Sequence, residues 1–198
     1  CNVTHDGVGN VVYEATRTGT RKISYYNSGR ARRIDDSAGS SVTMKYDSFG
    51  REQELDLAAG GETRSDRQYG AYIYNRYQLA GPLKANYIGR RFPGPGVLVS
   101  RRGVGGPWVI SFQEARGVRF STDEKGTFVQ DVDYEPFGEA TASGAAAGDQ
   151  TYSPEQWNGG DALGSLGLVH VGARLYDPVI GRFLSRDPLF APRTAATT

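Results

Sequence analysis

Two aspartates near the C-terminus each precede a proline, as Asp177-Pro178 and Asp187-Pro188, ten residues apart. Two carboxyl groups that share one proton can cut a peptide bond, because the neutral one donates a proton while the charged one activates water. An aspartate in such a position can also turn its carboxylate onto backbone N–H groups two residues further on. Within a single hairpin, turn formation explains Asp177 more readily than catalysis does.

The element that positions these aspartates is predicted to be a hairpin. A strand ends at Tyr176, a tight turn runs through Asp-Pro-Val-Ile-Gly at 177–181, and a second short strand follows the turn. Pro178 fixes its own φ and biases the residue before it toward an extended conformation, which suits a strand that stops there. We expect Tyr176 and Phe183 to pack against the rest of the chain and not to lie in solvent.

The longer run at 172–188 reads Gly-Ala-Arg-Leu-Tyr-Asp-Pro-Val-Ile-Gly-Arg-Phe-Leu-Ser-Arg-Asp-Pro. It resembles the core-associated segment of Rhs and YD-repeat proteins. That family includes bacterial polymorphic toxins, the C subunits of insecticidal Tc toxins and the YD shell of teneurins. The positions that carry the resemblance are Arg174, Tyr176, Asp177, Pro178, Gly181, Arg182, Phe183 and Pro188.

Shorter motifs upstream extend the resemblance. Residues 46–51, Tyr46-Asp47-Ser-Phe-Gly50-Arg51, match the Tyr-Asp-x-x-Gly-Arg core of a YD repeat, and residues 25–30 repeat the pattern with asparagine in place of the aspartate. The aspartate starts a turn and the glycine supplies a positive φ between two strands. Residues 134–139 are similar to the Tyr-Asp-Pro-Phe-Gly-Glu signal that opens the Rhs segment, with Glu135 in the place of its aspartate.

The resemblance implies a role for Asp187 as half of an aspartyl self-cleavage site. In self-cleaving members of the family, the matching aspartate works with a second aspartate in a further Asp-Pro-x-Gly segment downstream. This sequence ends at Thr198, eleven residues after Asp187, and contains no such segment. We therefore do not expect a working protease within these 198 residues.

Composition excludes several other classes of function. The chain has 23 basic and 22 acidic residues, a net charge of +1, so no overall charge favours nucleic acid or an anionic membrane. Arginines at 30, 32, 33, 90, 91, 101 and 102 are expected to be strand-surface charge, not a phosphate site.

With one cysteine, Cys1, and two histidines, His5 and His170, we expect no internal disulfide, metal or cofactor site. No apolar run is long enough to span a bilayer, and Cys1 is expected to be the cut end of a longer protein, not a lipidated terminus.

The fold class expected is all-β, with antiparallel hairpins of YD repeats spiralling into a partial β-shell. The 27 glycines and 12 tyrosines suit short strands and tight turns. We divide the chain into YD repeats at 1–56, shell strands and a connector at 57–130, and the Rhs core-associated segment at 131–198. Residues 57–68 are expected to be the polar connector and residues 140–150 an exposed loop. We expect no stand-alone hydrophobic core and a dependence on neighbouring strands of the parent protein or of another copy.

Two functions remain open. The resemblance implies a shell that encapsulates and presents a C-terminal toxin, with the toxin domain and the rest of the shell as partners, in a secreted or cell-surface protein. The alternative, which the resemblance to teneurins allows, is a cell-surface recognition module that binds a glycan or a protein through exposed tyrosines and the arginine clusters. The tyrosines are Tyr72, Tyr74 and Tyr87, whose rings can stack on flat or apolar faces.

Overall fold

A computed structural model of the chain describes residues 2–60, 62–69, 72–78, 86–94, 96–102, 108–114, 117–143, 157–163 and 166–187. Strands β1 to β9 are Val3–His5, Val11–Ala15, Thr20–Tyr25, Ala31–Asp36, Ser41–Tyr46, Glu52–Ala59, Glu62–Tyr69, Tyr72–Gln78 and Asn86–Gly94. Strands β10 to β18 are Val97–Arg102, Trp108–Glu114, Gly117–Asp123, Phe128–Tyr134, Ala140–Ser143, Asp161–Leu163, Leu168–Val171, Arg174–Asp177 and Arg182–Phe183. A single turn of 3-10 helix, Trp157–Gly159, precedes β15.

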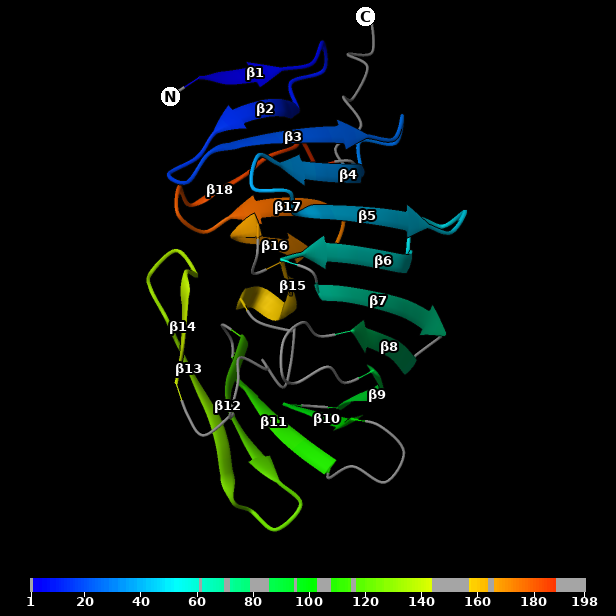
Figure 1. Cartoon of the computed structure of the whole chain (residues 1–198), viewed down its shortest axis with the longest axis vertical. Coiled ribbons are helices and arrows are strands. Elements are labelled where there is room, and N and C mark those ends of the chain that lie inside the picture. The colour runs from blue at the N-terminus through cyan, green and yellow to red at the C-terminus, as the bar shows by residue number, and fades with distance from the viewer. Residues whose placement is uncertain are drawn as a thin grey trace, which may run out of the picture.

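Strands β1 to β14 form one sheet in which every strand pairs antiparallel with the next along the chain (Figure 1). We call this 14-stranded sheet the wall. Strands β15 to β18 form a second antiparallel sheet of four strands, which we call the C-terminal sheet. Strands β1 and β14 lie at opposite edges of the wall and are not paired with each other, so the wall is open. The prediction of an all-β partial shell built from antiparallel hairpins is confirmed.

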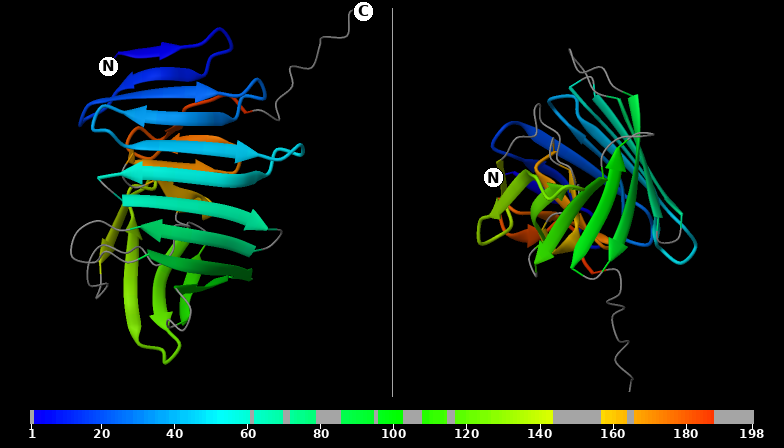
Figure 2. Two further views of the ribbon diagram at one scale, coloured as in Figure 1. Left: turned by 45° about the vertical axis from the view of Figure 1, so that its right-hand side comes forward. Right: turned by 90° about the horizontal axis from the view of Figure 1, so that it is seen from below.

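The wall curves around the C-terminal sheet, as the view from below in Figure 2 shows. A continuous apolar core lies between the two. Its buried members are Val11, Ile23, Ala31, Ile34, Val42, Met44 and Leu55 from the wall and Leu163, Leu166, Leu168, Leu175 and Leu184 from the C-terminal segment. The expectation that the chain has no hydrophobic core of its own is therefore wrong. The C-terminal segment folds back over the inner face of the first strands and supplies the second layer that a sheet needs.

Two other local expectations are also wrong. In the segment expected to be a connector, residues 57–59 belong to β6 and residues 62–68 to β7, and these two strands pair through six residue positions. The polar composition of residues 57–68 predicted a connector, but the segment includes most of strand β7, which places Arg64 and Asp66 on its buried side. There the two side chains form an ion pair with each other. Residues 140–143, expected to lie in an exposed loop, form the edge strand β14.

The turns predicted at residues 25–30 and 46–51 are present in the structure. Asp47 accepts hydrogen bonds from the backbone N–H groups of Phe49 and Arg51, both at 2.8 Å through Oδ1. Gly50 has a φ of 78° and Gly29, in the earlier repeat, a φ of 79°, a conformation that side chains with a Cβ avoid. The motif therefore encodes a hairpin turn whose aspartate fixes the loop and whose glycine allows it to close.

Candidate functional site at the junction of the wall and the C-terminal sheet

The segment that carries both aspartates forms the predicted hairpin. Strand β17 pairs with β18 through Tyr176 opposite Phe183 and Asp177 opposite Arg182. The turn between them is fixed by Asp177, whose Oδ1 accepts hydrogen bonds from the backbone N–H groups of Val179 at 2.9 Å and Ile180 at 3.3 Å. Turn formation, the role expected of Asp177, is confirmed by these bonds.

The aromatic residues of this hairpin connect it to the wall. Tyr176 is buried, and its hydroxyl donates a hydrogen bond of 2.8 Å to the carbonyl oxygen of Phe137 in the turn between β13 and β14. Burial raises the pKa of Tyr176, and the nearby charge of Asp177 adds to the effect. Phe183 packs edge-on against Tyr176 with ring centroids 5.3 Å apart, but 37% of its surface stays exposed. Tyr176 therefore lies against the wall as expected, whereas Phe183 packs on residues of the C-terminal sheet and stays partly exposed, contrary to the expectation for it.

Asp187 lies beyond β18 and is held by a different cation from the one that binds Asp177. Its Oδ2 is 3.6 Å from Nη2 of Arg174, whose guanidinium carbon also lies 3.6 Å from the centre of the Phe183 ring. The Asp187 side chain is 39% exposed. The structure therefore gives Asp187 and Asp177 separate surroundings, one open to solvent and one buried. Pro188 lies outside the described residues.

Asp177 belongs to a buried cluster of three charges. Arg21 on β3 lies with Nη2 3.3 Å from Asp177 Oδ2 and with Nη1 3.2 Å from Glu14 Oε1 on β2. The exposed fractions are 6% for Arg21 and 4% each for Glu14 and Asp177. Burial raises the pKa of Glu14, although Arg21 opposes the shift. The cluster thus holds two carboxylates with one buried cation.

A second polar contact joins the two sheets at β16. His170 is buried, with Nδ1 2.7 Å from Glu52 Oε2 on β6 and Nε2 3.3 Å from the hydroxyl of Tyr46 on β5. Burial raises the pKa of Tyr46, and the charge of Glu52 adds to this. The tyrosine of the YD motif therefore has two roles: it opens a turn in the wall and contacts the C-terminal sheet.

A third contact joins β15 to β7, where Asp161 lies 3.6 Å from Arg64. Arg64 also donates a 3.2 Å hydrogen bond to the carbonyl oxygen of Ala162. Three of the four strands of the C-terminal sheet therefore place an ionisable side chain against a wall strand, at Asp161, His170 and Asp177. We call these the three polar contacts. They position the C-terminal sheet, and the sequence analysis missed them because their partners are distant in sequence.

The other residues singled out from the sequence do not form a site among the described residues. Arg33 pairs with Asp35, while Arg30 and Arg32 lie over tyrosine rings, so each has a local partner. The side chains of Tyr72, Tyr74 and Tyr87 lie outside the described part, and so do those of the arginines at 90, 91, 101 and 102. Binding through those tyrosines stays a prediction.

In the described ranges, no three His, Cys, Asp or Glu side chains are grouped to hold a metal ion. The described helical turn is too short to cross a membrane.

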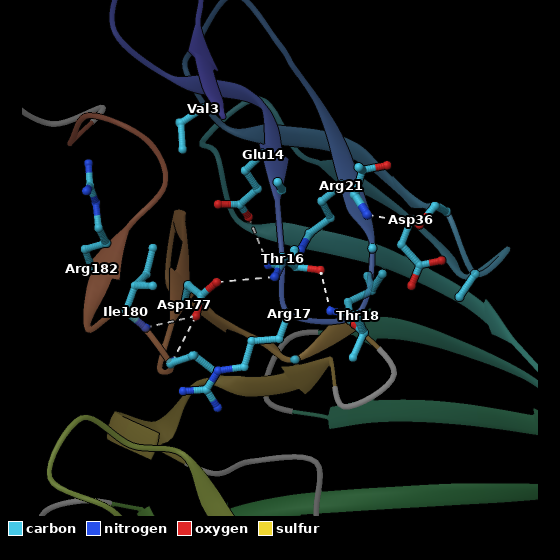
Figure 3. Close-up of a pocket in the computed structure, with 18 of the residues that line it drawn as sticks. Val3, Glu14, Thr16, Arg17, Thr18, Arg21, Asp36, Asp177, Ile180 and Arg182 are labelled. Carbon is cyan, nitrogen blue, oxygen red and sulfur yellow. Dashed lines mark hydrogen bonds and ion pairs between the residues drawn. The ribbon is translucent and has the colours of Figure 1, made fainter. Parts of the chain in front are cut away.

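A cavity of about 1000 Å³ opens beside the Arg21 cluster (Figure 3). It is bounded by the β2–β3 hairpin, the β4–β5 turn and the β17–β18 turn. Glu14, Arg21 and Asp177 all line it, so the buried charges face an open space.

No protein-family model matches the chain, and no curated protein sequence matches it. Several solved structures are similar to it. The chain is similar to the crystal structure of TcdB2-TccC3-Cdc42 with a TM-score of 0.74 and 17% identity, covering 93% of this chain and 10% of that one. It is similar to TcdB2-TccC3 with a TM-score of 0.74, 18% identity and the same two coverages. It also matches the Tc holotoxin pore of Photorhabdus luminescens, with a TM-score of 0.74, 18% identity and coverage of 93% of this chain and 9% of that one.

These likenesses show the fold. The chain has the architecture of a section of an Rhs-like shell, and it spans about a tenth of the length of the chains that it matches.

Proposed function

We propose that the chain is a section of a shell that encapsulates and presents a toxin domain C-terminal to it. The observation that carries this is the position of the C-terminal sheet, which is held inside the curve of the wall by an apolar core and the three polar contacts. A wall that encloses a payload needs an inward face, and the C-terminal sheet lies on that face of the wall.

The open edges of the wall support the same proposal. Strand β1 is exposed along its whole length, and β14 has no described strand on its outer side. A free strand edge presents unpaired N–H and C=O groups that accept another strand. In the proposed shell these edges pair with neighbouring strands of the parent protein, which is secreted or displayed at a cell surface.

In this proposal Asp187 supplies one carboxyl group of a self-cleavage site. It is partly exposed beside Arg174, at the point where the described chain leaves the C-terminal sheet. Two carboxyl groups that share a proton divide the roles of acid and base. The second carboxyl group comes from a segment further along the parent protein, because Asp177 is already engaged in its own turn and with Arg21.

The test uses the parent protein expressed with its downstream region. Asp187→Asn should abolish cleavage as seen by denaturing gel, because an amide cannot replace the acid or the base. The matched control is Asp123→Asn, which changes an exposed turn aspartate of the wall and should leave cleavage intact. Cleavage in Asp187→Asn at the unaltered rate contradicts the assignment of Asp187. Rapid proteolysis of the downstream region in the native protein contradicts encapsulation.

A further inference from the structure

The cavity beside the Arg21 cluster is lined by buried charged side chains at its inner end and by apolar side chains on one side. Its inner end holds Glu14, Arg21 and Asp177, each at least nine-tenths buried. Val179 and Ile180 from the β17–β18 turn line another side of the same space. Figure 3 shows the Glu14, Arg21 and Asp177 side chains converging between the β2–β3 hairpin and that turn.

The charges at the inner end do not balance. Arg21 is shared between two buried carboxylates, Glu14 and Asp177. Asp177 accepts two backbone N–H bonds, whereas Glu14 Oε1 and the facing Arg21 Nη1 make no hydrogen bond although they lie 3.2 Å apart. Burial raises the pKa of Glu14 and the charge of Asp177 adds to the shift, while Arg21 and the exposed Arg182 oppose it, so these guanidinium groups do not offset the loss of water. A further cation with N–H donors would bring the buried group of charges closer to balance.

We propose that this cavity binds a primary ammonium or guanidinium group at the end of an aliphatic chain, with the cation on Glu14 and the chain against Val179 and Ile180. Charge-assisted hydrogen bonds to a buried carboxylate are strong because the surroundings have a low dielectric constant. The source is either a basic side chain of a peptide or a free amine, since both present the same group. The inference concerns the cavity alone and holds whether or not the chain encloses a toxin.

An anionic ligand fits the site less well. The cavity is also lined by Arg17 and Arg182, but both are exposed. The exposed carboxylate of Glu139 and the half-buried one of Asp36 match these two charges in number. The buried inner end of the cavity, with two carboxylates and one arginine, therefore decides the sign of the charge. The site presents a negative charge to a ligand.

The test is an NMR titration of the chain with n-butylammonium, with the neutral n-butanol of similar shape as the matched ligand. We expect saturable shifts at the backbone amides of residues 14–21 and 177–182 with n-butylammonium and none with n-butanol. Equal shifts with both ligands, or none with n-butylammonium, would overturn the proposal.

A variant pair then locates the cation. Glu14→Gln should weaken binding by about tenfold or more, since a charge-assisted hydrogen bond is lost. The matched control Glu114→Gln changes an exposed glutamate of β11 that does not line the cavity and should leave binding unchanged. Equal binding by wild type and Glu14→Gln overturns the assignment. If Glu14→Gln fails to fold, the comparison of the two ligands on the wild-type chain still decides. A blocked Gly-Lys-Gly peptide separates the two sources: tighter binding than n-butylammonium indicates a peptide ligand, and equal binding indicates a free amine.

Discussion

Replacing Arg21 by methionine is the perturbation that tests the buried cluster most sharply. The change keeps much of the side-chain length but removes the one buried cation that Glu14 and Asp177 share. Breaking a buried ion pair by removing one partner costs about 3–5 kcal/mol, because the remaining charge is left uncompensated. For a chain of this size, that loss corresponds to a fall in Tm of roughly 6–20 °C.

The assay is urea unfolding followed by circular dichroism and tryptophan fluorescence, with the free energy of unfolding taken from the midpoint and slope. The matched control is Arg33→Met, which removes an arginine from an exposed pair with Asp35. Exposed pairs contribute about 0–1 kcal/mol. If Arg21→Met costs no more than Arg33→Met, the argument that the cluster positions the C-terminal sheet is wrong.

The pH dependence of the same variant gives a second check. The pKa of Glu14 is raised above its ordinary value of 4.5, so this group favours the folded state fully below pH 4.5 and loses that contribution as the pH rises through its folded pKa. Removing Arg21 takes away the charge that opposes the shift. The destabilisation by Arg21→Met should therefore be smaller at pH 4 than at pH 7. Adding Glu14→Gln to Arg21→Met should recover part of the loss at pH 7.

Two further predictions concern the turns and the aromatic contacts. Gly50→Ala should lower the free energy of unfolding by about 1–2 kcal/mol, because Gly50 has a φ of 78°. Gly7→Ala, with open space around the added Cβ, should have little effect in the same urea assay. Equal losses of stability in the two variants would contradict the role given to Gly50 in the turn. Tyr176→Phe should cost about 1 kcal/mol through loss of its hydrogen bond to the wall, and Tyr69→Phe, an exposed tyrosine, should cost less; thermal melts that rank the two in the opposite order would refute this.

The strands and turns could be predicted from the sequence because each turn is specified by residues that lie next to one another in the chain. An aspartate three residues before a glycine specifies a turn, as at Asp47 and Gly50, and the chain between such turns is too short for anything but hairpins. The hairpin whose first strand ends at Tyr176 is predicted from a related signal, in which Gly181 follows Asp177 by four residues. Its Asp177 is a turn residue for the reason that applies to Asp47.

The docking of the two sheets could not be predicted in this way. Arg21 and Asp177 are 156 positions apart, and Tyr46 and His170 are 124 apart. Nothing in a single sequence indicates which inward charge meets which partner. The strand β7 shows the same difficulty, because a polar segment is assigned to a connector unless one knows that Arg64 and Asp66 pair on its buried side.

We propose that the C-terminal segment lies within the curve of a shell and that this shell encloses a downstream domain of the parent protein. A cryo-EM map of the parent protein, expressed with its downstream region, measures this directly. We predict a hollow β-shell with residues 166–187 on its inner surface and density for the downstream domain inside. A map that places these residues on the outer surface, or the downstream domain outside in solvent, would contradict the account.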